Sequence, residues 1–136
     1  MADTLKLEIV IPGAVAYSQD VQMVTLPAVD GQIGIFPHHV PLLTRVVPGE
    51  IIVLKDGQQD FLAVGGGLVE ITGDHVAIVT DMAIAAKDID EAKVEEARQR
   101  AAARLADKIS DEEVATVNAS LARSLAQLRV KRRQRV

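Results

Sequence analysis

The sequence predicts a β + α protein, with an N-terminal β-sandwich or flattened barrel over residues 1–86 and a C-terminal antiparallel two-helix hairpin over residues 87–136. Three observations predict this division. Short apolar runs recur at intervals of about ten residues in the first part. Dipeptides typical of tight turns separate several of these runs. Glycine and proline then disappear after Lys87, where alanine becomes the commonest residue.

The first part has the pattern of short β-strands. Residues 5–11 carry an apolar side chain at every second position, which is typical of a strand with one buried face. Five further runs have β-like composition, namely residues 21–27, 50–55, 59–64, 67–71 and 75–80. Asp56-Gly57 and Gly73-Asp74 separate neighbouring runs and suit tight hairpins whose central residues have positive φ. Many short strands with such turns are typical of a sandwich or barrel.

The second part has the pattern of two helices. Asp88 followed by Glu91, and Ser110 followed by Glu113, are N-capping patterns, each worth about 1 kcal/mol. They predict helices over residues 89–107 and 111–131. The expected apolar stripes are Val94, Ala97, Ala101, Leu105 and Ile109 on the first helix and Val114, Val117, Leu121, Leu125 and Leu128 on the second. Because alanine buries little apolar surface, a contact lined largely by alanine predicts a hairpin that detaches at modest cost.

Composition narrows the classes of function. The chain has no cysteine, so it has neither a disulfide framework nor a thiolate site. Residues 1–86 carry ten acidic and three basic side chains, whereas residues 87–136 carry nine acidic and twelve basic ones, so the two parts should meet different partners. We expect neither a signal peptide nor a membrane span, because no basic n-region and no long apolar run is present. A peripheral place on a membrane complex stays open.

The stretch GQIGIFPHHVPLLT, residues 31–44, places His38 and His39 between two prolines. Neighbouring histidines on an extended segment point to opposite faces, and no third ligand is near in sequence. We therefore expect a stiff connection outside the sheet ladder, acting as a structural or interface corner and not as a metal or catalytic site. The residues expected to anchor this connection in the core are Ile33, Ile35 and Phe36.

The remaining motifs predict no reaction chemistry. The glycines at residues 65–67 lie between two strand patterns, with no Lys-Ser/Thr after them, so a bulge or tight corner is expected and not a phosphate loop. The serines lack the context of a nucleophile elbow. The acidic cluster at residues 88–96 lacks the glycine and spacing of a calcium loop. These patterns predict a protein that is not an enzyme and holds no metal.

The end of the chain is strongly basic, with no acidic residue after Arg123. Its cations are Arg123, Arg129, Lys131, Arg132, Arg133 and Arg135. Nucleic acid is disfavoured as a partner, because aromatic residues make up 2% of the chain and cannot form a stacking platform. Favourable cation placement at a helix C-terminus and a docking surface for an acidic protein stay open. The alternative function is a stand-alone β-sandwich module whose basic helical tail docks an acidic protein or nucleic acid.

Residues 31–44 resemble the stretch G-x-[IL]-G-[IVL]-x-P-x-H-x-P-L-L of the epsilon subunits of bacterial F-type ATP synthases. Shorter matches are Gly66-Gly67 before a strand, DMAI at residues 81–84 and AQLRV at residues 126–130. The resemblance spans essentially the whole chain. It implies a sandwich of about ten strands, followed by a helical hairpin.

The resemblance also implies a role. The sandwich would bind the gamma subunit and sit on the ring of c subunits, in the rotating central stalk that couples proton flow to ATP synthesis at the cytoplasmic face of the bacterial inner membrane. The contact residues so implied are Asp30, Gly31, Gln32 and His39. The hairpin would extend among the alpha and beta subunits and block ATP hydrolysis. Acidic loops of the beta subunits would then face Arg123, Arg129, Lys131, Arg132 and Arg133.

Some family members bind ATP as a regulatory ligand through the motif [IL]-D-x-x-R-A. The matching stretch here is IDEAKV at residues 89–94, in which lysine replaces the arginine and valine the alanine. Lysine keeps the charge but lacks the planar fork that suits phosphate. The ATP-binding residues implied by the resemblance are Ile89, Asp90, Lys93 and Arg100. No other cofactor is expected.

Overall fold

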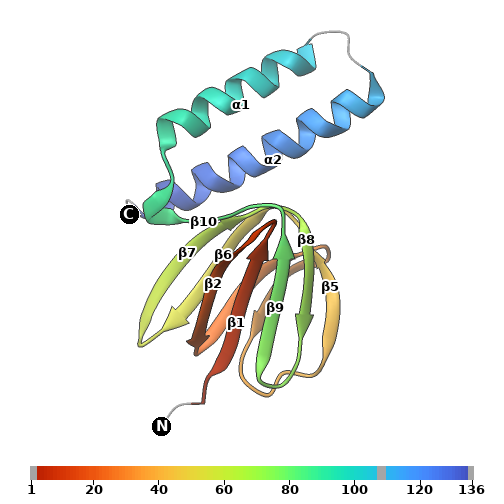
Figure 1. Ribbon diagram of the computed structural model, residues 1–136. Coiled ribbons are helices and arrows are strands. Elements are labelled where there is room, and N and C mark those ends of the chain that lie inside the picture. Colours follow the sequence, from red (N-terminus) through yellow and green to blue (C-terminus); the bar gives the residue numbers. More distant parts are fainter. Residues whose placement is uncertain (1–2, 107–109, 135–136) are drawn as a thin grey trace.

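The structure is a computed structural model that describes residues 3–106 and 110–134. One ten-stranded sheet curls into an open barrel, and two antiparallel helices lie across one end of it, opposite the N-terminus (Figure 1). The predicted fold class is therefore confirmed. The strands are β1 (Leu5–Ile11), β2 (Ala14–Val21), β3 (Met23–Ala28), β4 (Gly31–Ile35), β5 (Leu42–Val46), β6 (Gly49–Lys55), β7 (Gln58–Val64), β8 (Gly67–Ile71), β9 (His75–Thr80) and β10 (Ala83–Ala85). A 3₁₀ turn, η1 (Ala86–Asp88), leads into α1 (Glu91–Ala106) and α2 (Asp111–Gln134).

The sheet has the strand order β10-β7-β6-β3-β5-β8-β9-β1-β2, and β4 pairs with β3 beside this path. The pairing of β1 with β9 is parallel, and the other strand pairs are antiparallel. Alternate side chains fill the barrel, as in β1, where Leu5, Leu7 and Ile9 are buried. The barrel thus has its own aliphatic core, which is separate from the cluster that the hairpin contacts.

Four strands were missed by the sequence prediction: β2, β4, β5 and β10. β2 is an edge strand whose side chains are mostly exposed, so no alternation of apolar and polar residues marks it. β4 contains two glycines, and β10 has three residues. Asp56 and Gly57 have the expected positive φ, of 52° and 76°. The hairpin between β8 and β9 also forms, but Gly73 does not have positive φ.

The expectation for residues 31–44 was wrong in part. Most of this stretch belongs to β4 and β5, so only residues 36–41 lie outside the ladder. Ile35 is buried and Ile33 packs against the core, but Phe36 is 60% exposed. The reason is that β4 ends at Ile35, so Phe36 is the first residue released from the sheet. His38 is not extended either, since its φ is 71°.

The hairpin packs on the outside of the barrel through a second apolar cluster, where α2 lies against β6 and β7. Its buried members are Ala63, Ala86, Ile89, Val94, Leu128 and Val130. Only two of these six are alanine, so the expectation of an alanine-lined contact was wrong at the interface with the sheet. The larger aliphatic groups come from the connection before α1, from the first turn of α1 and from the last turns of α2. The hairpin is therefore held more firmly than its composition suggested.

The helix boundaries differ slightly from those predicted. The first helix starts later, because Ile89 is extended and buried, and Asp90 instead of Asp88 caps it by accepting a hydrogen bond from the backbone N–H of Lys93 at 3.2 Å. Ser110 caps α2 as predicted, since its hydroxyl accepts from the N–H of Glu113 at 3.2 Å. Leu125, expected in the buried stripe, is 50% exposed. The expected positions Asp107, Ile109 and Arg135 lie outside the described residues.

Candidate protein-interaction surfaces

The basic residues of α2 contact acidic groups of the same chain. Arg123 donates from Nη1 to Oδ2 of Asp81, in the link between β9 and β10, at 3.0 Å. Arg132 lies 3.3 Å from a carboxylate oxygen of Glu91 and 3.7 Å from one of Glu95, both on α1. In the folded hairpin these two cations are therefore turned toward their own chain.

Arg133 pairs with a buried carboxylate. Its Nη1 lies 2.9 Å from Oε1 of Glu50 on β6, and its guanidinium lies 5.5 Å from the centre of the Phe61 ring. Glu50 is only 5% exposed, and among the described residues its Oε2 has no hydrogen-bond partner. Burial raises the pKa of Glu50, while the charges of Arg133 and Arg129 act in the opposite direction. The carboxylate therefore depends on α2 for its counter-charge.

The two other cations expected to contact beta subunits also lie near the sheet. Lys131 donates from Nζ to the carbonyl oxygen of Ala86 at 3.3 Å. Arg129 lines a pocket of about 400 Å³ together with Glu50 and Arg133. All five predicted cations thus lie in the second half of α2, and three of them, Arg123, Arg132 and Arg133, pair with carboxylates of their own chain.

The glycines of the β7–β8 connection permit two close approaches. A Cβ on Gly65 would lie 1.8 Å from Oδ1 of Asp81, so the missing side chain makes room for the carboxylate that holds Arg123. A Cβ on Gly67 would lie 1.9 Å from the backbone oxygen of Val79. These glycines form the expected tight corner between strands.

The residues expected to face the c ring and gamma lie at the two ends of β4. Asp30, Gly31 and Gln32 are exposed at the start of the strand, and Gly31 has a φ of 119°. Gly31 and Gln32 line the small pocket beside Arg129. His39 lies beyond the other end of β4, after a strand that spans about 13 Å. The structure therefore does not gather the four residues into one cluster.

The neighbouring histidines have different partners, one of them distant in sequence. Nε2 of His38 lies 3.0 Å from a carboxylate oxygen of Asp3, and Nδ1 of His39 lies 2.6 Å from the carbonyl oxygen of Val40. Within residues 3–106 and 110–134, no group of three or more histidine, aspartate or glutamate side chains could hold a metal ion. The pair thus belongs to the connection between β4 and β5.

The residues implied for ATP lie around the start of α1, in different surroundings. Ile89 is buried in the cluster between hairpin and sheet, and Asp90 serves as the helix cap. Lys93 is exposed, and Arg100 pairs with Glu96 of the same helix at 3.3 Å. Because seven residues make almost two turns, Lys93 and Arg100 share one face of α1, about 10 Å apart along its axis.

An exposed apolar row crosses the outer face of the sheet, and sequence reasoning missed it. Leu68 of β8 pairs with Val79 of β9, Val79 pairs with Val10 of β1, and Val10 pairs with Val15 of β2. Leu68, Val79 and Val15 are more than half exposed. Each strand contributes one outward aliphatic residue, so only the register of the four strands reveals the row. A continuous exposed apolar stripe of this kind is typical of a docking surface.

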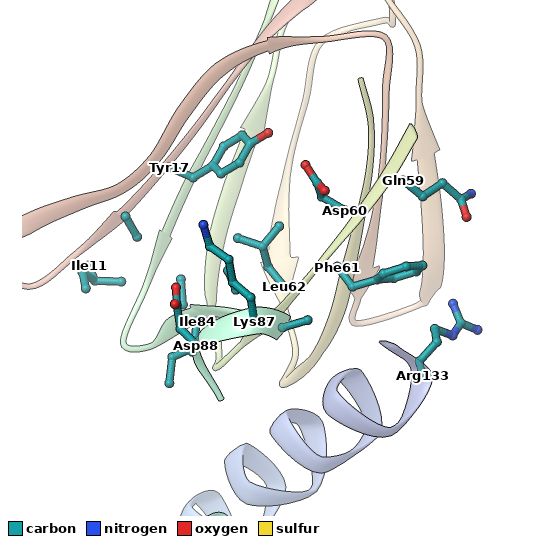
Figure 2. A pocket seen from close by; sticks show the side chains of 14 residues that line it. Ile11, Tyr17, Gln59, Asp60, Phe61, Leu62, Ile84, Lys87, Asp88 and Arg133 are labelled. Carbon is teal, nitrogen blue, oxygen red and sulfur yellow. The ribbon is translucent and has the colours of Figure 1, made fainter. Parts of the chain in front are cut away.

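A pocket of about 1230 Å³ opens where the barrel is not closed, between β2 and the strands β7 and β10 (Figure 2). Figure 2 shows Tyr17, Lys87 and Asp60 directed into the same space, with Arg133 beside Phe61 at one side. Burial raises the pKa of Tyr17, and the charge of Asp60 adds to the effect. Cations and carboxylates both line the pocket, so it favours no single class of ligand.

In the described residues, no helix has the length and hydropathy needed to cross a membrane. Two protein-family models match the chain in succession. The β-sandwich domain of the ATP synthase delta/epsilon chain matches residues 4–86, and the long α-helix domain of the same chain matches residues 87–132.

Curated proteins match over nearly the full length. The ATP synthase epsilon chain of Alkalilimnicola ehrlichii is 39% identical over 133 residues, covering 97% of this chain and 95% of the relative. The ATP synthase epsilon chain of Nitrosococcus oceani is 40% identical over 136 residues, covering 99% and 97%.

Solved structures match the fold. A chain in the mitochondrial ATP synthase OSCP/F1/c-ring of Euglena gracilis aligns with a TM-score of 0.74 at 20% identity, covering 88% of this chain and 76% of that one. A chain in the mitochondrial central stalk/c-ring of Tetrahymena thermophila aligns with a TM-score of 0.64 at 12% identity, covering 95% and 97%. Because both sequence identities are low, these matches to solved structures support the fold and nothing further.

Proposed function

The chain belongs to the ATP synthase delta/epsilon family, and from this premise we propose that it is the non-catalytic epsilon subunit of the central stalk of a bacterial F-type ATP synthase. The observation that carries the proposal is the match of both domains, in order, to epsilon chains over nearly the full length. The subunit would turn with the rotor and help couple proton translocation through the c ring to ATP synthesis. The alternative, a stand-alone binding module, lacks comparable support.

The barrel would join gamma to the c ring at the cytoplasmic face of the inner membrane, as a peripheral part of the complex. The exposed row of Leu68, Val79, Val10 and Val15 supports docking on gamma, because burying it would remove a continuous apolar stripe from water. The contacts proposed for gamma and the c ring at the ends of β4 are Asp30, Gly31, Gln32 and His39.

Replacing Val79 by aspartate should weaken binding to the gamma subunit about tenfold or more, because the partner would have to bury an unpaired charge. The measurement is the affinity of the purified chain for gamma, with thermal denaturation to verify that the variant is folded. Leu125→Asp is the matched control, since Leu125 is similarly exposed but lies on α2. Equal affinity of the Val79 variant and the native chain would remove this face from the interface. Failure of the native chain to bind gamma would reject the function itself.

The hairpin would act as a conformational inhibitor of ATP hydrolysis, by leaving the barrel and extending among the alpha and beta subunits. Its proposed contacts with acidic loops of the beta subunits are Arg123, Arg129, Lys131, Arg132 and Arg133. The ion pairs of Arg123, Arg132 and Arg133 with their own chain support a folded form in which these contacts are withheld. A change from mostly folded to mostly extended requires about 5.5 kcal/mol of differential binding.

For ATP as a regulatory ligand at Ile89, Asp90, Lys93 and Arg100, we expect weak binding, in the millimolar range. Lys93 stands where the family motif has arginine, and it cannot form the two parallel hydrogen bonds that a guanidinium makes to phosphate. Lys93→Arg should therefore tighten binding, as measured by titration calorimetry of the isolated chain. Micromolar binding by the native chain, or no change in the variant, would contradict this assignment.

A further inference from the structure

We infer that the sheet domain carries its own acidic docking site for α2, formed by Asp81 and Glu50, and that this site competes with the external acidic partner for Arg123 and Arg133. The competition rests on the inhibitory function proposed above, whereas the docking site rests on the folded chain alone. Arg123 and Arg133 each have a carboxylate of the sheet domain within 3.0 Å. Because α2 must leave the sheet domain to reach the external partner, it gives up these two ion pairs when it binds there.

The two halves of the docking site differ in character. Asp81 and Arg123 are both partly exposed, so their pair exchanges readily with water and with other anions. Glu50 is almost fully buried, and withdrawal of the end of α2, which carries both Arg133 and Arg129, would leave its carboxylate without a counter-charge. The Asp81 half is therefore the easier one to open, and the Glu50 half resists release of the end of α2.

The spacing of the two ion pairs, Arg123 with Asp81 and Arg133 with Glu50, also sets a requirement on the external partner. Arg123 and Arg133 are ten residues apart on one continuous helix, which places them about 15 Å apart along its axis. A surface that takes α2 from the sheet domain must present carboxylates at a comparable separation. An acidic protein surface with two carboxylate groups about 15 Å apart meets this requirement.

Gly65 allows the docking site to be tested without any change of charge. A Cβ at this position would collide with Oδ1 of Asp81, and the carboxyl group would rotate away from Arg123. The φ of Gly65 is not positive, so alanine fits the backbone. Asp81→Asn and Gly65→Ala should therefore have the same effect by independent means. Glu96→Gln is the matched control, because it removes an exposed carboxylate whose partner lies on the same helix.

The first measurement is amide hydrogen exchange of α2 in the purified chain. Asp81→Asn, Gly65→Ala and Arg123→Gln should each speed exchange about two- to fivefold, the range expected for a partly exposed ion pair. Glu96→Gln should leave it unchanged. Unchanged exchange in both Asp81→Asn and Gly65→Ala would overturn the docking site.

The second measurement is inhibition of ATP hydrolysis in the assembled enzyme. Substitutions of the two partners of the ion pair between Asp81 and Arg123 should change this inhibition in opposite directions. Asp81→Asn frees Arg123 for the external partner and should strengthen inhibition, whereas Arg123→Gln removes the shared cation and should weaken it. A shift in the same direction for both variants would overturn the competition. Faster exchange in the chain, with hydrolysis insensitive even to deletion of residues 88–136, would reject the inhibitory function and leave the docking site standing.

Discussion

Replacing Leu128 by alanine should free the hairpin from the barrel. Leu128 is 2% exposed and belongs to the cluster that joins α2 to the sheet, together with Ile89, Val94 and Val130. Truncating a buried leucine costs about 2–5 kcal/mol, because the apolar contact is lost and a cavity is left behind. Since Leu128 belongs to the cluster between the hairpin and the sheet and not to the barrel core, most of this cost should fall on docking. Amide exchange of α2 should accelerate by about thirtyfold or more.

Leu125→Ala is the control for this prediction. It removes the same atoms from the same helix, but Leu125 is half exposed, so the change in stability should stay within about 0.5 kcal/mol. The sheet domain should keep its protection in both variants, because its core is built from a separate set of residues. Similar exchange of α2 in the two variants would show that the cluster does not hold the hairpin.

Replacing Gly67 by alanine should destabilise the barrel itself. The new Cβ would meet the backbone oxygen of Val79 at 1.9 Å and Cα of Thr80 at 2.9 Å, and neither atom can rotate away as a side chain could. β8 and β9 would have to separate at the point where Gly67 pairs with Thr80. We expect a loss of about 3 kcal/mol or more in the free energy of unfolding, measured by urea denaturation.

Gly66→Ala is the matched control, because its Cβ would find its nearest neighbour, the backbone oxygen of Val46, at 3.7 Å. That distance is an ordinary van der Waals contact, so the barrel should keep its stability. If Gly66→Ala and Gly67→Ala lower the free energy of unfolding equally, the close approach at Gly67 is not the cause. The loss of stability would then reflect only a general preference for glycine in this corner.

The strands that the sequence predicted well are those with a clear difference between their two faces. β1, β8 and β9 have the predicted bounds, because alternate residues enter the core. β2 was missed because its edge position leaves both faces exposed, and β4 because glycine obscures its pattern. The helical hairpin was predictable from composition and from the cap at Ser110, since both signals are local in sequence.

The candidate surfaces were harder to predict, because each depends on residues that are distant in sequence. The basic end of α2 was visible, but its partners Asp81 and Glu50 lie 42 and 83 positions before Arg123 and Arg133. The apolar row likewise depends on the register between β1, β8 and β9, which alternation alone does not fix. The sequence alone shows only that Val10 points out of the sheet. Its apolar neighbours Val15 and Val79 lie on adjacent strands and are found only from the register.

The parallel pairing of β1 with β9 has a consequence for the order in which the molecule is made. Leu7 pairs with Val76, so the first strand cannot complete its hydrogen bonds until nearly the whole sheet domain has left the ribosome. Contacts between such distant positions slow folding, because a long loop must be closed before they form. The helices are synthesised after the sheet domain, so the strands they pack against are already made when they appear. Maturation of this subunit should therefore be limited by barrel closure, with the hairpin arriving as a late and fast event.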